Sequence, residues 1–191
     1  GEFIYSLNVT DIKTGWCETR AIMGKGEKGV VTALEDIRKC LPFGLKAIDS
    51  DNGSEFINYH LVRYCEAHEL QFTRGRPYKK NDNAHIEQKN WTHVRRIFGW
   101  DRYDTSEQIV AMNALYRGDL PTMMNLFQPC IKLIRKERKG SRLQKFYDKP
   151  KTPLDRLAEV AQVTPALTRL LAKREGIDPF KLSKSVEGQL K

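Results

Sequence analysis

The order in which strand-like and helix-like patterns follow one another is the feature that most constrains the fold of this chain. β-branched and aromatic residues mark strands, and apolar residues at helical spacing mark helices. The order is strand, strand, helix, strand, helix, strand, helix, helix, and the first two strands are expected to form a hairpin around a turn at residues 11–15. The predicted ranges are 3–9, 16–22, 30–41, 45–48, 56–68, 70–73, 83–98 and 106–125, the last bent near Gly118 and Pro121. This order predicts a mixed α/β domain.

The character of the chain changes after residue 126. Residues 130–151 are dense in Lys and Arg, with a Lys139-Gly140-Ser141 turn between two expected strands. Thr152-Pro153 and Thr164-Pro165 are typical of helix starts, because proline is tolerated in the first helical turn. The sequence therefore predicts a core domain over residues 1–126. A basic C-terminal region over 127–191 follows, with two strands and then two or three short helices.

The positive charge is concentrated in the middle of the 191-residue chain. Residues 71–151 hold 18 Lys and Arg against 8 Asp and Glu, whereas residues 1–70 hold 8 against 11. A basic block of this kind is the expected footprint of a polyanion partner such as nucleic acid. A solvated basic face is the competing interpretation, and a segment that contacts the acidic N-terminal half is another.

Other features exclude several classes of protein. No apolar run approaches the length of a membrane helix, and no signal peptide is visible. The cysteines at positions 17, 40, 65 and 130 form no Cys-x-x-Cys pair, so they predict free thiols and neither a zinc ribbon nor a redox motif. The chain begins with Gly1 and enters a strand pattern directly, which suggests a piece of a longer protein.

Two carboxylates, Asp51 and Glu87, border the basic block. Asp51 follows a short apolar strand, and Glu87 lies early in a predicted helix. The carboxyl end of a strand is where open α/β sheets present functional groups, and hard oxygen ligands suit Mg²⁺. Such carboxylates predict metal-dependent chemistry on phosphodiesters. Asp49 and Asp11 are interpreted instead as a solvated strand-end carboxylate and a turn residue.

Several motifs occur in order around these carboxylates. They are Asp51-Asn52-Gly53-Ser54-Glu55-Phe56, residues 76–90 (RPYKKNDNAHIEQKN), Asn125-Leu126-Phe127-Gln128-Pro129, and residues 147–153 (YDKPKTP). Over about residues 2–157 the chain resembles the integrase-core transposases of bacterial insertion sequences, which share the DDE catalytic core of retroviral integrases. The resemblance implies a ribonuclease H-like integrase core that lacks its first strand. The first catalytic Asp of that family, carried on the missing strand, is not identifiable here.

The resemblance implies a function as well as a fold. It implies DNA transposition or integration, by metal-dependent phosphodiester cleavage and strand transfer, with Asp51 and Glu87 as catalytic residues and metal ligands. The cofactors would be two Mg²⁺ or Mn²⁺ ions. The partners would be DNA, as the element ends and a target duplex, and the protein would act as a homo-oligomer. It would have no membrane partner and would lie in the bacterial cytoplasm, near the nucleoid. Without the first Asp, the chain alone is expected to bind DNA but to join strands poorly or not at all.

Two other functions stay open at this point. One is a ribonuclease H-type nuclease that cuts without joining, and the other is a non-catalytic DNA-binding or assembly protein derived from a transposase. The candidate DNA-binding residues lie in the loop before the Glu87 helix, on that helix and in the basic segment after residue 130. They are Arg74, Arg76, Tyr78, Lys79, Lys80, Asn83, Asn90, Lys132, Arg135, Lys136, Arg138, Lys139 and Arg142. A flexible basic loop is the alternative interpretation of the loop residues. For Asn83 and Asn90, helix capping and solvent contact are equally simple uses.

Overall fold

The N-terminal strands form the predicted hairpin. The computed structural model describes residues 2–50, 59–75 and 88–190. Within them, β1 (Ile4–Thr10) pairs antiparallel with β2 (Cys17–Met23) over their whole length. Asp11 closes the turn, because its Oδ2 accepts from the backbone N and the Oγ1 of Thr14 at 2.7 and 2.6 Å. Gly15 follows at φ +79°, a conformation that glycine adopts without strain.

The next four elements alternate helix and strand, as predicted. They are α1 (Glu27–Cys40), β3 (Ala47–Ser50), α2 (Tyr59–Ala67) and β4 (Gln71–Arg74). β3 and β4 run parallel, with Ser50 opposite Arg74. The apolar face of α1 is buried at Val30, Ala33, Leu34 and Ile37, which are the positions that the helical spacing marks.

A long helical stretch follows, interrupted twice. Residues 88–90 are helical and continue into the π-helical segment η2 (Trp91–Arg95) and the single turn α4 (Arg96–Phe98). After a loop come α5 (Ser106–Arg117), α6 (Asp119–Thr122) and the π-helical η3 (Met123–Phe127). The predicted break at Gly118 is confirmed, since the backbone leaves the helical region there.

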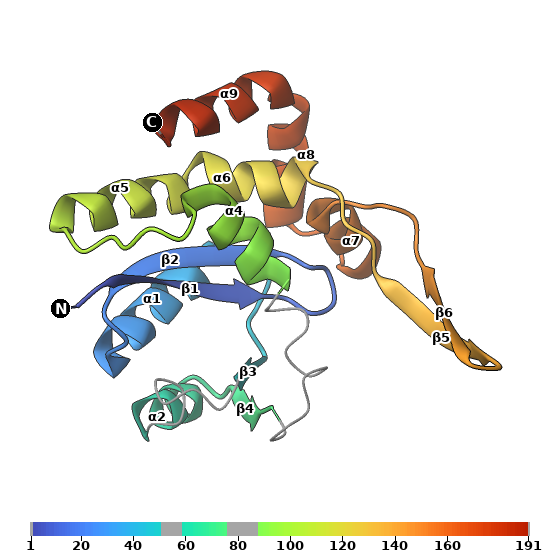
Figure 1. Ribbon diagram of the computed structural model, residues 1–191, viewed down its shortest axis with the longest axis horizontal. Coiled ribbons are helices and arrows are strands. Elements are labelled where there is room, and N and C mark those ends of the chain that lie inside the picture. The colour runs from blue at the N-terminus through green and yellow to red at the C-terminus, as the bar shows by residue number, and fades with distance from the viewer. Residues whose placement is uncertain (1, 51–58, 76–87, 191) are drawn as a thin grey trace.

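The C-terminal region has the predicted strands and three helices. β5 (Leu133–Lys139) and β6 (Arg142–Tyr147) pair antiparallel around Gly140, and they reach away from the rest of the molecule as a ribbon (Figure 1). The helices are α7 (Pro153–Val160), α8 (Pro165–Glu175) and α9 (Pro179–Gln189), each with proline in its first turn. The hydroxyls of Thr152 and Thr164 cap the first two of them, which confirms the predicted helix starts.

The hairpin lies between two layers of helices (Figure 1). On one side, Leu7 and Ile22 share a core with α1 and α2, against which Ile48 and Phe72 of the parallel strands pack. On the other side, Ala21 packs with residues of α5, α6 and α9. Trp16 and Leu126 join α7 and α8 in a third cluster, so the C-terminal helices pack against the core. The division at residues 126 and 127 stays a prediction.

A network of ion pairs around the buried Arg20 ties these layers together. Arg20 of β2 is 2% exposed, and its Nε donates to Asp36 of α1 at 2.5 Å. Arg117 of α5 donates to the same carboxylate at 3.0 Å, and Arg20 also pairs with Glu18 at 3.3 Å. Burial raises the pKa of Glu18. The network balances the buried charges, as interior charges require.

The two edges of the hairpin differ. On the β2 edge, Asn125 accepts from the backbone N of Cys17 and donates to its carbonyl, both at 2.9 Å. Asn113 does the same for Ala21, again at 2.9 Å each. The two side chains take the place of a neighbouring strand, so the sheet ends at β2.

Among the described residues, the β1 edge has no backbone partner over most of its length. Ile4 N donates to Tyr103 O at 2.7 Å, but the outward backbone groups of Ser6, Asn8 and Thr10 bond to no other backbone within the described residues. The edge of β3 that faces away from β4 also has no strand beside it in the described part of the chain. Both edges could accept another strand.

Candidate functional site

The carboxyl ends of β3 and β4 meet at one edge, and the predicted catalytic Asp51 follows directly. Ser50, the last residue of β3, is buried, and its carbonyl accepts from Gly75 N at 2.8 Å. Arg74, a predicted DNA-binding residue, lies directly across from Ser50 with an exposed side chain whose guanidinium is 5.6 Å from the Phe72 ring. Asp51 itself lies outside the described residues. The parallel pairing therefore places Arg74 at the edge where the chain enters the Asp51 segment.

Asp49 has its own partner at this edge. Its Oδ1 accepts from the hydroxyl of Thr73 at 2.6 Å, across the β3–β4 pair, and the contact is exposed to solvent. This agrees with the interpretation of Asp49 as a solvated strand-end carboxylate. It makes Asp49 a natural control for Asp51, because both carboxylates belong to the same short stretch of sequence.

The predicted residues of the basic loop lie outside the described chain, and so does the predicted catalytic Glu87. The loop residues in question are Arg76, Tyr78, Lys79, Lys80 and Asn83. The described chain continues from Gln88, and Asn90 is exposed on the helix that residues 88–98 form. Trp91 is 53% exposed and Trp100 is 71% exposed, which shows that neither is a core residue. Arg95 covers the Trp100 ring, with its guanidinium 4.3 Å from the centroid.

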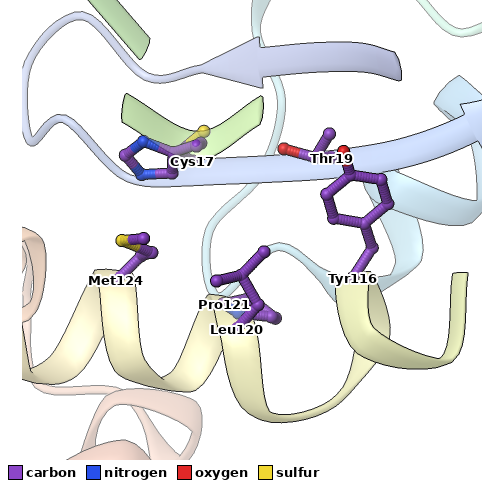
Figure 2. A pocket seen from close by; sticks show the side chains of 7 residues that line it. Cys17, Thr19, Tyr116, Leu120, Pro121 and Met124 are labelled. Atoms are coloured by element: carbon purple, nitrogen blue, oxygen red, sulfur yellow. The ribbon is translucent and has the colours of Figure 1, made fainter. Parts of the chain in front are cut away.

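His93 anchors this helix to the core. It lies in η2, is 6% exposed and lines a small cavity of about 10 Å³ together with residues of β2 and of the α5–η3 stretch. Figure 2 shows Cys17 and Thr19 on the strand side of this cavity and Leu120, Pro121 and Met124 on the helices that face it. The Nδ1 of His93 lies 2.7 Å from the Thr92 hydroxyl, and the Nε2 of His93 has no hydrogen-bond partner among the described residues. Burial, with a smaller contribution from Lys89, lowers the pKa of His93 to about 3.

The buried His93 makes folding sensitive to mild acid. Below its ordinary pKa of about 6.5, the unfolded chain binds a proton that the folded chain excludes, so stability falls as the pH falls. We expect the free energy of unfolding of the wild type to drop, relative to His93→Leu, by up to about 1.4 kcal/mol per pH unit between pH 6.5 and 5. Urea unfolding of both proteins across this range measures the difference. Parallel curves would contradict a buried neutral imidazole.

The other predicted DNA-binding residues lie on or beside the β5–β6 ribbon. Arg135, Lys136, Arg138, Lys139 and Arg142 are all exposed on the two strands. None of these positions is tested for DNA contact by the structure, so the assignments stay predictions. Lys145, of the same basic segment, is exposed as well.

Lys132 has a structural role at the base of the ribbon. Its Nζ donates to the carbonyls of Ile12 and Lys13, at 2.6 and 2.5 Å, and so joins the ribbon to the turn of the N-terminal hairpin. Burial, together with the nearby Arg156, lowers its pKa. Its predicted DNA contact would be additional to these bonds.

Asp148 holds the other strand of the ribbon base. It accepts from Lys132 N at 2.6 Å and from Nη1 of Arg156 at 2.5 Å, and Arg156 also donates to Cys130 O at 2.8 Å. The bond from Arg156 lowers the pKa of Asp148 to about 2. Asp148 belongs to the YDKPKTP motif, whose Thr152 caps α7. This motif therefore has a structural role.

No alternative metal site is found in the described residues. Residues 2–50, 59–75 and 88–190 contain no group of three or more His, Cys, Asp or Glu placed to hold a metal ion. All four cysteines are free, as predicted. The same residues contain no helix long and apolar enough to cross a membrane.

The comparisons with known proteins bear on the fold first. The chain is similar to the catalytic core domain of BIV integrase, with a TM-score of 0.50 and 16% sequence identity over 82% of this chain and 86% of that one. The chain shares the mixed α/β fold of an integrase catalytic core. The predicted class of fold is thereby confirmed. At this level of identity the likeness concerns the fold alone.

Sequence comparison finds a relative that carries no functional description. The uncharacterized protein y4rM of Sinorhizobium fredii (strain NBRC 101917 / NGR234) is 40% identical over 157 residues. These cover 82% of this chain but 44% of y4rM, so the chain spans less than half the length of that relative. No family model matches the chain.

Proposed function

We propose that this chain belongs to a DDE-type transposase or integrase that cuts DNA and joins a 3′ hydroxyl to a target strand. The observation that carries the proposal is the integrase-core fold, in which Asp51 directly follows the carboxyl end of β3. Arg74 stands across the strand pair at the same edge, where a cation favours a nearby phosphate. In the sequence, Glu87 directly precedes the helical residues 88–98, which His93 anchors to the core.

The donor set fits the divalent metal that this chemistry requires. Asp51 and Glu87 offer hard carboxylate oxygens, the ligands that Mg²⁺ and Mn²⁺ prefer. When bound, two such ions stabilise both the attacking and the leaving oxygen of an in-line displacement at phosphorus. The chain itself would hold the ions through these two carboxylates and position the DNA through its basic residues.

We further propose that the longer protein supplies one strand between β1 and β3, and with it the first Asp. Three observations support this. The β1 edge is open at Ser6, Asn8 and Thr10, and the outer edge of β3 has no neighbour among the described strands. The β2 edge, in contrast, is closed by two asparagines. In addition, Asn8 Nδ2 and Ser50 Oγ, on the two strands that would flank it, are buried without a partner in the described chain.

A strand-transfer assay tests the proposed function. The protein would be extended upstream through the preceding strand and incubated with Mn²⁺ and a labelled duplex that carries an element end. DNA strands longer than the substrate are expected, because joining lengthens them. Only shorter strands would indicate a nuclease, and DNA binding without any new strand would favour a non-catalytic DNA-binding or assembly protein.

A further inference from the structure

The β5–β6 ribbon has two chemically different faces. In an antiparallel pair, directly opposed residues point to the same face, and successive pairs alternate between faces. Lys136 pairs with Lys145, and Arg138 pairs with Leu143, so these four side chains share one face. We call it the cationic face. All four side chains are exposed, and the face carries no carboxylate.

The opposite face satisfies part of its charge internally. It carries the pairs Arg135 with Phe146, Glu137 with Gln144, and Lys139 with Arg142. The Nε of Arg135 donates to Glu137 at 2.7 Å, and its guanidinium lies 4.2 Å from the centre of the Phe146 ring. Glu137 and Phe146 are half-buried by this arrangement. We call this the self-paired face.

The cationic face is unfavourable for folding on its own. Lys136 and Lys145 are directly opposed, and like charges in that position destabilise a strand pair. Within the described chain, neither of these lysines nor Arg138 forms an ion pair with a carboxylate. An anion bound along this face would remove the repulsion. The self-paired face also opposes two cations, Lys139 and Arg142, but Glu137 neutralises Arg135, so that face carries less net positive charge and has less to gain from an anion.

The ribbon is also held so that it can present this face. At its base, Lys132 bonds to the turn of the N-terminal hairpin and Asp148 bonds to Arg156 of α7. Beyond the base, the two strands extend away from the domain (Figure 1). They are 7 and 6 residues long, which at about 3.3 Å per residue corresponds to roughly 20 Å. The β5–β6 ribbon is therefore fixed at its base and accessible along the rest of its length.

We propose that the cationic face is the surface through which the ribbon binds the phosphate backbone of duplex DNA, with the self-paired face turned away. The major groove admits a two-stranded β-ribbon, and phosphates on its walls would meet Lys136, Arg138 and Lys145. Leu143, 53% exposed between these cations, suits an apolar contact in the groove. This inference rests on the proposed function for the identity of the anion as DNA.

Two triple variants with the same change in charge test the inference. One removes the cations of the cationic face (Lys136→Gln, Arg138→Gln, Lys145→Gln), and the other removes those of the self-paired face (Arg135→Gln, Lys139→Gln, Arg142→Gln). Binding of a fluorescent duplex would be measured by anisotropy over a series of salt concentrations. The slope of the logarithm of the binding constant against the logarithm of salt concentration measures the phosphate contacts, at about 0.9 per contact. In the cationic-face variant this slope is expected to become shallower by about two to three units, and the affinity to fall roughly tenfold or more. The control variant changes three residues that the sequence offers as DNA-binding candidates but that the inference turns away from the duplex, so it is expected to lose less than about one unit of that slope.

Each other outcome overturns the inference in a recognisable way. Equal losses in both variants would show that the ribbon acts only through its net charge, with the proposed function intact. Unchanged binding by the cationic-face variant would leave an acidic protein as the partner of this face. A wild-type chain that binds no duplex at all would overturn the inference together with the DNA-binding part of the proposed function. Circular dichroism and unfolding midpoints, compared between the variants, confirm that each one is folded.

Discussion

Replacing Glu87 by Gln in the upstream-extended protein is expected to lower Mn²⁺-dependent strand transfer by more than about a hundredfold. The amide keeps the shape of the side chain but removes the negative charge that a divalent ion requires. Changes to groups that only orient metal ligands cost about 10–100-fold, so the loss of a ligand should cost more. DNA binding should persist, because the amide removes no basic group.

Two neighbouring carboxylates, Asp51 and Asp49, provide a matched comparison of a predicted ligand with a control. Asp51→Asn should reproduce the loss, whereas Asp49→Asn should retain activity within about twofold, as exposed substitutions usually do. The Asn at position 49 could still accept the bond from the Thr73 hydroxyl. If Asp49→Asn abolished strand transfer and Asp51→Asn did not, the assignment of the metal ligand would be wrong. The assay reports the rate at which labelled ends appear in longer strands.

Replacing Asn125 by Ala is expected to destabilise the chain by about 3 kcal/mol, the largest effect on stability that we predict. Asn125 is fully buried and satisfies both backbone groups of Cys17, which is itself 2% exposed. Truncation leaves a buried donor and a buried acceptor unpaired, at a cost of about 1–3 kcal/mol each. The free energy of unfolding, extrapolated from urea titration, measures this loss.

Asn113 provides the comparison for Asn125. It makes the same two bonds, to Ala21, but its side chain is only half-buried, so water can replace part of what the mutation removes. Asn113→Ala is therefore expected to cost about 1 kcal/mol. Equal costs at the two positions would mean that burial does not decide the penalty at this sheet edge. A cost below about 1 kcal/mol for Asn125→Ala would contradict its role in closing the β2 edge.

The elements of the fold were predictable because they depend on local patterns. The apolar spacing over α1 and the turn at Asp11 predict structure within a few residues, and the threonine–proline pairs at 152 and 164 predict helix starts in the same way. The interruption at Gly118 follows from the same kind of signal. Each of these needs only neighbouring residues, so a single sequence contains the information.

The sheet edge was not predictable, because its contacts join distant parts of the chain. Asn125 bonds a residue 108 positions away, and Asn113 bonds one 92 positions away. The sequence marks Asn125 only as part of a motif, without a role. The burial of His93 was missed for the same reason, since a lone histidine on a helix carries no signal of what packs against it.

The candidate site, like the fold, was predictable from the sequence only in part. The density of Lys and Arg predicts a basic segment, but the two ribbon faces depend on strand register, which shifts at an irregularity between Leu133 and Arg135. That register places Lys145 opposite Lys136. Lys132 belongs to the same basic segment by sequence, yet its ammonium group bonds to carbonyls of a turn about 120 residues earlier.

The most direct test of the central claim is to locate Mn²⁺ in crystals of the upstream-extended protein by anomalous scattering. We predict a peak between the carboxylates of Asp51 and Glu87, at metal–oxygen distances of roughly 2.0–2.2 Å, beside a new strand paired with β1 and β3. A well-ordered structure in which these two carboxylates lie too far apart to share a metal, or in which Mn²⁺ binds elsewhere, would contradict the account.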